Sequence, residues 1–492
     1  MKKIIIIGGG IAGLSAGIHA QLEGFQTEIY EKNPVPGGEC TGWNRHGYHI
    51  DNCIHWLTGC QEADELYGLW KTLDVLGEGV ELYREPYFYM LEMNGSQLHF
   101  WRDLEKARRE FLTAAPEDTV ELNCFFDAVK LAECMRIPFE KSPAHMSPFA
   151  FMRFGMKMSP MMKVMKEYGS QTIAQFAARF KNPSVRAMMS RYYQQNFMAY
   201  SLIVSYAFFT SGTAAIPLGG STGMVGRMVS RYESLGGKLH LNVPVQQICV
   251  ENQQATGIEL HDGTFLPADG IICATDTAVT FQKLLKESYM DKNLKKMYDN
   301  RTGYPVNSAF QVALGIQGTL PKGLHSGSVM FPCAPYTVAT KTADFLAIRL
   351  YDYDKSLFPS ENCVIQCNLL QNEEDFAYWE KLYTDQEAYK TEKQRLAKAV
   401  MERICAQYPQ LQGKLLLLGT YSPITFTRWC GAYRGAYMSF FPQGNSKSLY
   451  VKSTVKGLYN VFLAGQWLQC NGGLPIAATS GKFAVQALTR MK

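Results

Sequence analysis

The chain has 492 residues, which is too long for one hydrophobic core, so two or more lobes are expected. Apolar residues make up 47% and charged residues 19%, as in an ordinary globular protein, and a net charge of +5 is too small to indicate binding to nucleic acid. The 13 cysteines are an odd number and are scattered, and no secretion signal is recognisable, so reduced thiols in a cytoplasmic protein are expected.

The first predicted element is a buried parallel strand of four isoleucines, residues 4–7. A secretion signal is the alternative, but it needs an apolar run of roughly 7–15 residues. Glycines follow instead, with Gly8, Gly10 and Gly13 in the pattern G-x-G-x-x-G, then a predicted helix over 11–23 and a second strand that ends at Glu31. Such a turn brings backbone N–H groups to a pyrophosphate, and the carboxylate suits a ribose hydroxyl. The stretch therefore predicts a dinucleotide site.

The residues after this second strand carry a family resemblance. A glycine pair, Gly37-Gly38, is followed by Gly47-Tyr48 and Asp51 in the pattern GY-x-x-D. Together with the glycine turn, these motifs resemble the FAD-dependent phytoene desaturase, carotenoid isomerase and retinol saturase family, within the amine oxidase-like flavoprotein superfamily. Two later blocks, 236–276 and 458–488, resemble the family's second and closing FAD segments in the same order. Together the three blocks cover roughly a third of the chain.

The resemblance implies FAD as the cofactor and an α/β fold with a Rossmann-type FAD-binding domain. The residues that it assigns to FAD are Gly8, Gly10, Ile11, Ala12, Gly13, Glu31, Lys32, Gly37, Gly38, Glu39, Val245, Gly465, Gln466, Gly473, Leu474 and Pro475. Three positions depart from the pattern. Glu39 stands where many superfamily members carry Arg beside the flavin phosphates, Cys53 replaces a glycine, and Gln466 replaces an acidic ribityl contact.

The resemblance also implies a discontinuous FAD-binding domain of residues 1–70, 215–290 and 415–492. Residues 70–140 and 290–415 are expected to form a mixed α+β substrate domain, and 141–214 a helical, Met-rich insertion. Within 70–140, helical spacing predicts a helix whose apolar face carries Val120, Cys124, Ala128 and Leu131. Within 290–415, strands are predicted near 307–316, 345–354 and 362–370, and a helix over 387–408.

The Met-rich insertion permits two interpretations. Nine Lys and Arg accompany one Glu between residues 141 and 191. Such a segment suits an anionic membrane surface or an adaptable entrance for a greasy substrate. A helix with core-facing methionines and a solvated basic face is the other interpretation. The uncharged stretch 197–216 is too weakly apolar to span a bilayer, so we expect a buried helix and no transmembrane segment.

A second glycine-rich stretch, 216–228, lacks a framing strand and acidic partner, so we expect no separate nicotinamide site. It predicts a helix start capped by Ser221 or Thr222. The one dense polar cluster comprises His46, His49, Asp51, Cys53, His55 and Cys60. No metal site is expected there, because alternating strand positions scatter such residues to opposite faces.

No motif for a hydrolytic nucleophile is recognisable, as expected where a flavin supplies the redox chemistry. Candidate catalytic residues are His55, Arg428 and Tyr433. The leading hypothesis is an FAD-dependent desaturase, saturase or redox-driven isomerase of a long polyunsaturated lipid, such as a carotenoid or retinoid. The alternatives are a flavin amine oxidase, and a membrane-surface or lipid-carrier protein with structural FAD. The expected partners are the hydrophobic substrate and a membrane surface, with no nucleic acid; the oligomeric state stays open.

Overall fold

The computed structural model of the protein describes residues 2–141, 146–359 and 362–490. Its first sheet is parallel and five-stranded, in the order β19-β13-β1-β2-β9. These strands are β1 (Lys3–Ile7), β2 (Gln26–Tyr30), β9 (Lys238–His240), β13 (Gly270–Cys273) and β19 (Val461–Leu463). The isoleucines of β1 are buried on both faces of the sheet, which is why a continuous β-branched run suits this position.

Four helices cover one face of the parallel sheet. They are α1 (Ile11–Leu22), α2 (Glu65–Thr72), α10 (Gly220–Ser234) and α16 (Leu474–Leu488). Ile4 and Ile6 point to these helices, whereas Ile5 and Ile7 point to the opposite face. That face packs against a small antiparallel sheet, β10 (Val245–Glu251), β11 (Gln254–Leu260) and β12 (Phe265–Pro267), and against α11 (Thr277–Val279) and α12 (Lys292–Asp299).

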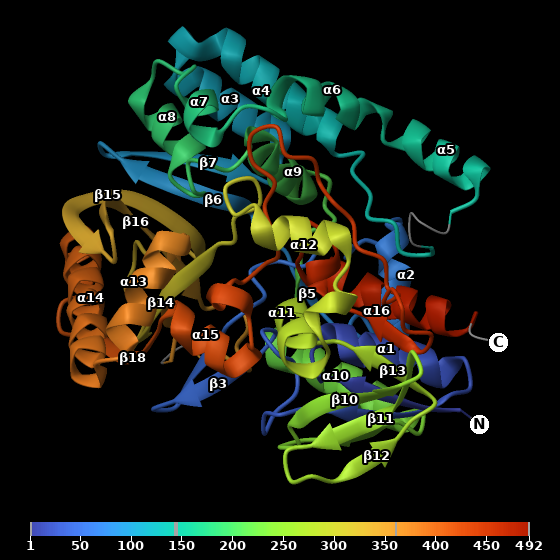
Figure 1. The fold of residues 1–492 in the computed structure, drawn as a ribbon. Coiled ribbons are helices and arrows are strands. Elements are labelled where there is room, and N and C mark those ends of the chain that lie inside the picture. The colour runs from blue at the N-terminus through green and yellow to red at the C-terminus, as the bar shows by residue number, and fades with distance from the viewer. Residues whose placement is uncertain (1, 142–145, 360–361, 491–492) are drawn as a thin grey trace.

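A second large sheet has seven strands in the order β18-β14-β17-β16-β15-β6-β7. Their bounds are β6 (Tyr87–Met93), β7 (Ser96–Trp101), β14 (Ser308–Ile316), β15 (Gly327–Val338), β16 (Lys341–Tyr351), β17 (Val364–Gln371) and β18 (Leu415–Tyr421). Two helices, α13 (Glu373–Tyr383) and α14 (Gln386–Gln407), pack on one face (Figure 1). The strands and the long helix predicted between residues 290 and 415 are all present.

The strands of the parallel sheet come from the three segments assigned to the FAD-binding domain, 1–70, 215–290 and 415–492. One strand differs from the prediction. β18 lies at the start of the third segment, yet it pairs with β14 and so belongs to the seven-stranded sheet. The run LLLLGTY suits a strand in either sheet, so its pairing could not be recognised from local sequence. The division into domains itself stays a prediction.

Helices gather beside β6 and β7 (Figure 1). They are α3 (Leu104–Ala114), α4 (Thr119–Ala132), α5 (Pro148–Lys157), α6 (Ser159–Tyr168), α7 (Ile173–Ala177), α8 (Pro183–Ser190) and α9 (Ala199–Thr210). The expected apolar face of α4 was wrong at three of its four residues: Ala128 is buried, but Val120, Cys124 and Leu131 are exposed, whereas Leu122, Phe125 and Phe126 are fully buried. The expectation followed spacing without weighing the larger side chains, whose burial decides which face turns inward.

Helix α9 is buried, as expected, with Leu202, Ile203 and Tyr206 in the core of the helical group. Across the described ranges 2–141, 146–359 and 362–490, every helix is too short or too polar to cross a bilayer. The remaining elements are β3 (Gly42–Arg45), β4 (Tyr48–Asp51), β5 (Leu82–Tyr83), β8 (Ile216–Pro217), α15 (Pro423–Cys430), 3₁₀ turns at 116–118, 287–289, 409–411, 433–435 and 466–468, and a π turn at 280–284.

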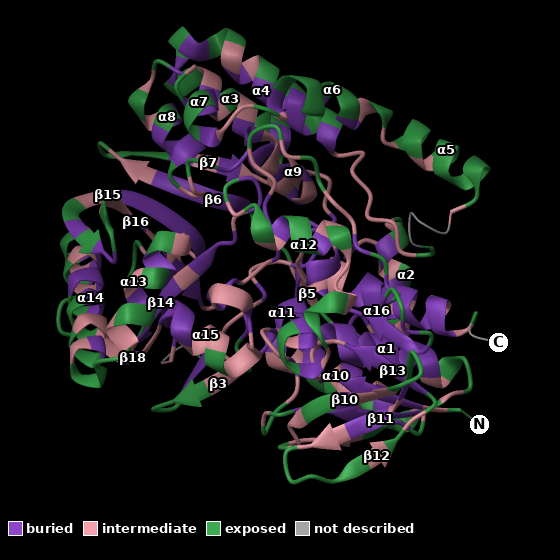
Figure 2. Cartoon of the chain, viewed as in Figure 1, coloured by how far each residue is buried: buried purple, intermediate pink, exposed green. Residues whose placement is uncertain are grey.

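The Met-rich helices α5 and α6 lie at the outer edge of the helical group, and α5 projects from it (Figures 1 and 2). No residue of α5 is buried, and Phe149 is 70% exposed. Helix α6 buries Met161 and Val164 but exposes Met162. The interpretation with core-facing methionines therefore holds for part of α6 and is wrong for α5.

Candidate functional site

The glycine turn after β1 forms an uncapped helix N-terminus. Gly8 has φ +104°, and a Cβ there would lie 2.9 Å from the carbonyl oxygen of Ala274. Helix α1 begins after Gly10 and has no side-chain cap. The first N–H groups of a helix, here those of Ile11, Ala12 and Gly13, have no partner within it. This turn therefore presents free donors and a positive dipole end to an anion.

Glu31 closes the turn from the end of β2. Its buried carboxylate accepts hydrogen bonds from the backbone N–H of Gly9 (2.8 Å) and of Asn33 (2.9 Å). The neighbouring Lys32 is directed elsewhere, because its Nζ donates to the carbonyl oxygen of Arg428 (3.0 Å). Of these two predicted cofactor residues, Glu31 lies at the turn, and the side chain of Lys32 contacts α15.

The second glycine pair lies directly beside the turn. The N–H of Gly37 donates to the Gly9 carbonyl (2.9 Å), and a Cβ on Gly38 would lie 3.5 Å from the Cα of Gly10. The next residue, Glu39, is half-buried, and desolvation together with the nearby Asp276 raises the pKa of its carboxyl to about 8. At neutral pH Glu39 is therefore mainly protonated and can donate a hydrogen bond to an anion.

Asp276 is a site residue that the prediction missed. It follows β13 and accepts hydrogen bonds from the backbone N–H of Tyr433 (2.8 Å) and of Ala278 (2.7 Å). Burial raises the pKa of its carboxyl to about 7, against these hydrogen bonds. An acidic residue at the carboxyl end of a buried parallel strand was the available signal, since ligands gather at such strand ends.

The closing segment supplies a second uncapped helix N-terminus. Helix α16 starts after Gly473, which has φ +94°, and Pro475 occupies its first turn without a side-chain cap. Gln466 joins this helix to the glycine pair: its Nε2 donates to Glu39 (3.2 Å), and its Oε1 accepts from the N–H of Gly473 (2.8 Å). Gly465 in turn donates its N–H to the Ser480 hydroxyl within α16 (2.8 Å). Gln466, from the third predicted FAD segment, thus contacts Glu39 from the first segment.

Val245 is the first residue of β10. Just before it, the backbone N–H of Val243 donates to the carbonyl oxygen of Glu31 (2.9 Å). The predicted FAD residues of all three blocks therefore lie in one continuous region. Its two free helix N-termini suit a diphosphate, and Glu31 suits a ribose hydroxyl, so the residues present fit FAD. The assignment of each single residue to FAD stays a prediction.

A parallel sheet with a glycine turn, a terminal carboxylate and a closing helix N-terminus defines a dinucleotide-binding fold. The sequence model of the family described as "Flavin containing amine oxidoreductase" matches residues 11–489. The chain therefore belongs to the flavin-containing amine oxidoreductase family. It is an FAD-dependent oxidoreductase.

Individual relatives support the resemblance to the desaturase and isomerase family within this larger family. The chain is 22% identical over 520 residues to a lycopene-forming phytoene desaturase from Paracoccus sp., covering 99% of this chain and 97% of the relative. It is 23% identical over 485 residues to the chloroplastic prolycopene isomerase of Daucus carota, covering 93% and 75%. A solved putrescine oxidase variant shares the fold, with TM-score 0.60, 15% identity and 99% coverage of both chains. The predicted resemblance to the desaturase and isomerase family is confirmed.

The three candidate catalytic residues are not brought to one place. His55 lies 3.4 Å, Nε2 to Nδ2, from Asn368 on the seven-stranded sheet, and burial, with nearby Arg349, lowers its pKa to about 3. Tyr433 lies beside Asp276, with its ring edge-on to Trp467. Arg428 instead stacks its guanidinium over Tyr383, 5.5 Å from the ring centre. His55 is thus a neutral imidazole beside the second sheet, and Tyr433 a wall of the FAD region.

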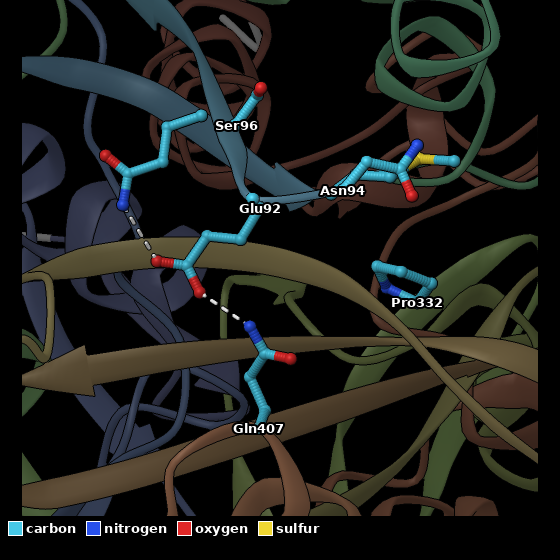
Figure 3. Close-up of a pocket in the computed structure, with 8 residues that line it drawn as sticks. Glu92, Asn94, Ser96, Pro332 and Gln407 are labelled. Carbon is cyan, nitrogen blue, oxygen red and sulfur yellow. Dashed lines mark hydrogen bonds between the residues drawn. The ribbon is translucent and has the colours of Figure 1, made fainter.

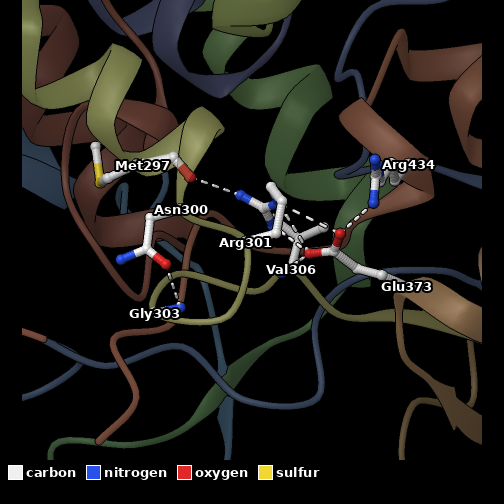
Figure 4. A network of polar contacts seen from close by, with 7 residues as sticks. All are labelled: Met297, Asn300, Arg301, Gly303, Val306, Glu373 and Arg434. Atoms are coloured by element: carbon white, nitrogen blue, oxygen red, sulfur yellow. Dashed lines mark hydrogen bonds and ion pairs between the residues drawn. The ribbon is translucent and has the colours of Figure 1, made fainter. Parts of the chain in front are cut away.

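A network of ion pairs and hydrogen bonds next to Tyr433 fixes the position of this residue at the FAD region (Figure 4). Glu373, in the first turn of α13, binds both Arg434 and Arg301 and accepts the N–H of Val306 (3.0 Å). Arg434 adopts φ +53°, which is unfavourable for a residue with a side chain. Its ion pair with Glu373 stabilises this conformation and so positions the neighbouring Tyr433.

Helix α10 begins differently from the prediction. Ser221 and Thr222 do not cap it; Gly219 is the N-cap residue. The carboxylate of Asp51 in β4 accepts the N–H of Ser221 (2.7 Å), and that of Asp354 accepts the N–H of Gly219 (2.7 Å). Distant carboxylates thus replace a local cap, a contact that local sequence does not reveal. No group of three potential metal ligands occurs among the residues that the structure describes.

A surface pocket of about 400 Å³ lies at the turn between β6 and β7 (Figure 3). Glu92 accepts hydrogen bonds there from Gln97 (3.1 Å) and Gln407 (3.0 Å). The residues that line this pocket are Glu92, Met93, Asn94, Gly95, Ser96, Gln97, Pro332 and Gln407. None of the predicted cofactor or catalytic residues lines this pocket.

Proposed function

We propose that this FAD-dependent oxidoreductase acts on a long, hydrophobic, polyunsaturated lipid such as a carotenoid or retinoid. The observation that carries the proposal is an aromatic cluster that starts beside His55. Trp56 contacts Phe88, Phe208 and Phe209 at ring-centre distances of 6.4, 5.8 and 5.7 Å. Aromatic rings of this kind suit a conjugated hydrocarbon chain, which needs apolar surface and no counter-charge.

The cluster continues into the helical group. Phe88 packs edge-on against Tyr192, and Tyr192 stacks on Tyr89 at 4.1 Å. Tyr192 and Phe208 are only half-buried although they belong to the same packed aromatic group. Part of the surface of these two rings is therefore left uncovered by the chain and could contact a ligand.

FAD, when bound, exchanges a hydride with a substrate carbon, which permits desaturation, saturation or a redox-driven isomerisation. Glu31 and the helix N-termini would hold the cofactor, and the aromatic cluster would hold the lipid and exclude water. Neutral His55 would add no charge to this region. The desaturase and isomerase relatives support this substrate class.

A flavin amine oxidase ranks second. That chemistry calls for two aromatic rings facing each other around an amine. Among the candidate aromatic residues near the FAD region, Trp43 pairs with Tyr421 and Tyr433 pairs with Trp467, at interplanar angles of 71° and 88°. Edge-on pairs do not offer two parallel faces, so this geometry favours the lipid.

The test is an anaerobic titration of the purified flavoprotein with polyene, retinoid and fatty-acyl lipids, in the oxidised and in the dithionite-reduced state. Bleaching of oxidised flavin would indicate desaturation, and reoxidation of reduced flavin would indicate saturation. Product change without net redox change would indicate isomerisation. If every lipid is inert while an amine bleaches the flavin, the amine oxidase hypothesis replaces this one. Bound lipid without any reaction would favour a lipid carrier with structural FAD.

We further propose that the protein is peripheral at a membrane and contacts it through α5. Exposed apolar side chains on this helix are Phe149, Phe151, Met152 and Met156, and the neighbouring cations are Arg153, Lys157, Lys163 and Lys166. This combination suits an anionic bilayer surface, where aromatic and Met side chains enter the interface and cations meet lipid phosphates. A water-insoluble substrate would then be collected where it dissolves.

Vesicle sedimentation tests this contact. The wild-type protein should bind vesicles containing phosphatidylglycerol more strongly than pure phosphatidylcholine vesicles. The double variant Phe149→Ser/Met152→Ser should lose most of this binding. Tyr459→Ser, which changes a 71% exposed aromatic residue elsewhere on the chain, is the matched control and should bind as wild type does. Equal binding by all three proteins would refute the contact.

A further inference from the structure

One face of the seven-stranded sheet, the polar face, carries several buried polar side chains among apolar ones such as Ala313 and Val364. In β16, Leu346, Ile348 and Leu350 point to the core with α14, so Arg349 and Tyr351 point to the opposite face. The same alternation in neighbouring strands adds more polar side chains to that face, namely Ser328, Gln311, Gln366 and Asn368. A surface that binds a pure hydrocarbon would not need these polar groups.

This polar face contacts the His55 segment of the FAD-binding region. Gln366 donates to the carbonyl oxygen of Asp51 (2.9 Å), and Arg349 donates to that of His55 (3.0 Å). The aromatic cluster begins at the next residue, Trp56. The polar groups therefore lie where the proposed lipid site approaches the flavin region.

At the centre is a buried ion pair between Arg349 and Glu85, 2.6 Å apart, whose side chains are only 7% and 3% exposed. Arg349 also donates to the hydroxyl of Ser328 (3.1 Å). Among the residues that the structure describes, its Nε nevertheless has no hydrogen-bond partner, and neither has Oε2 of Glu85 or the hydroxyl of Tyr351. The guanidinium lies 5.5 Å from the Tyr351 ring centre. Buried polar atoms without partners are costly, so a ligand that pairs with them gains affinity.

We propose that Glu85, Arg349 and Tyr351 bind a hydroxyl group of the substrate, so that the lipid is an alcohol rather than a bare hydrocarbon. This inference rests on the proposed lipid function. A hydroxyl can accept from Arg349 Nε and donate to Glu85 Oε2 at once. A carboxylate would add a third charge to a pair that is already neutral, and a hydrocarbon would leave the free atoms unpaired.

The experiment compares three C20 isoprenoids on the oxidised holoenzyme: geranylgeraniol, the hydrocarbon with hydrogen in place of its hydroxyl, and geranylgeranoic acid. Dissociation constants are measured by quenching of tryptophan fluorescence, without turnover. The alcohol should bind at least 10-fold more tightly than the hydrocarbon or the acid. Equal binding of the three would overturn the hydroxyl site while leaving the lipid function intact. No binding of any isoprenoid would overturn the lipid function, and this inference with it.

Two variants locate the site. Arg349→Lys keeps a cation beside Glu85 but removes Nε. Tyr351→Phe removes a hydroxyl that has no partner within the described part of the chain, so the thermal stability of this variant should stay at the wild-type value. Each should reduce the preference for the alcohol several-fold and leave hydrocarbon binding unchanged. Tyr336→Phe is the matched control: its hydroxyl is also buried without a partner among the described residues, but its ring packs against Arg403, away from Glu85. A preference that survives in Tyr351→Phe, or falls equally in the control, would contradict the assignment.

Discussion

A Cβ atom on Gly481 would lie 2.5 Å from the carbonyl oxygen of Ala12, because α16 and α1 cross almost in backbone contact. Both helices begin at the FAD region, so their crossing fixes the distance between the two free N-termini. Gly481→Ala should destabilise the protein by about 1–3 kcal/mol through overpacking and should weaken FAD binding. Thermal unfolding and FAD titration measure the two effects. Gly226→Ala, an exposed position inside α10 with nothing within 4 Å, should be neutral or slightly stabilising.

Glu39 should make FAD binding depend on pH. Its pKa is about 8 in the folded chain against 4.5 for an unperturbed carboxyl, so the folded state keeps a proton that the unfolded chain releases. Stability is therefore lost as the pH rises from the unfolded pKa through 8. The ionised carboxylate would also repel the diphosphate, so FAD affinity should fall between pH 7 and pH 9. Melting temperatures from about pH 5 to pH 9 and FAD dissociation constants from about pH 7 to pH 9 test the expectation.

The variant Glu39→Gln isolates this group. It cannot ionise, so its FAD affinity and melting temperature should vary less above pH 7; the remaining variation would come from Asp276, whose pKa is about 7. Glu62→Gln, on the surface, is the control and should follow the wild-type curve. A variant curve as steep as that of the wild type would exclude Glu39 as the source.

Glu31 should be required for cofactor affinity. Its two oxygens accept from two backbone N–H groups, and the amide of Glu31→Gln would turn a donor toward one of them. We expect a fall in FAD affinity of about 10- to 100-fold, which corresponds to one or two charge-assisted hydrogen bonds. Fluorescence titration of the apoprotein measures it. Glu23→Gln, exposed just past α1, should bind FAD as wild type does.

Asp51 should contribute to stability from outside the cofactor region. It is fully buried, and besides the N–H of Ser221 it accepts that residue's hydroxyl (2.5 Å) and the N–H of Cys53 (3.1 Å). Asp51→Asn should cost about 1–3 kcal/mol, because one amide atom would face donors. Urea unfolding gives the value. Asp103→Asn, at the exposed cap of α3, should change stability little, because Asn caps helices about as well as Asp.

The parts of this protein that sequence predicts best are local. Four isoleucines, a glycine turn and a carboxylate at the end of the next strand specify β1, α1 and β2 with their ligand site, because each signal is complete within about thirty residues. The prediction of which face of α4 is buried was wrong at three of four residues, because spacing alone does not weigh side-chain size. The cap of α10 was missed because Asp51 is 170 residues away from Ser221.

The polar face of the seven-stranded sheet was missed for the same reason. Arg349 stands in the apolar strand FLAIRLY, and a charge in such a strand signals a buried partner. That partner, Glu85, lies 264 residues earlier, in a segment without any catalytic motif. Pairing over such a distance follows from the fold and could not be predicted from either segment alone.

The order of the parallel sheet also bears on how the chain is made. β1 pairs with β13, and β13 with β19, so Ile5, Ile271 and Val461 are neighbours in space. During synthesis, the first strand therefore waits for residues near position 270 and then for those near 461 before the sheet is complete. Apolar strands that must wait are exposed to aggregation, and contacts of such long range form slowly. FAD should therefore bind only after β19 and α16 have been made, and a chain that ends before β19, at residue 457, should leave the ribosome without flavin.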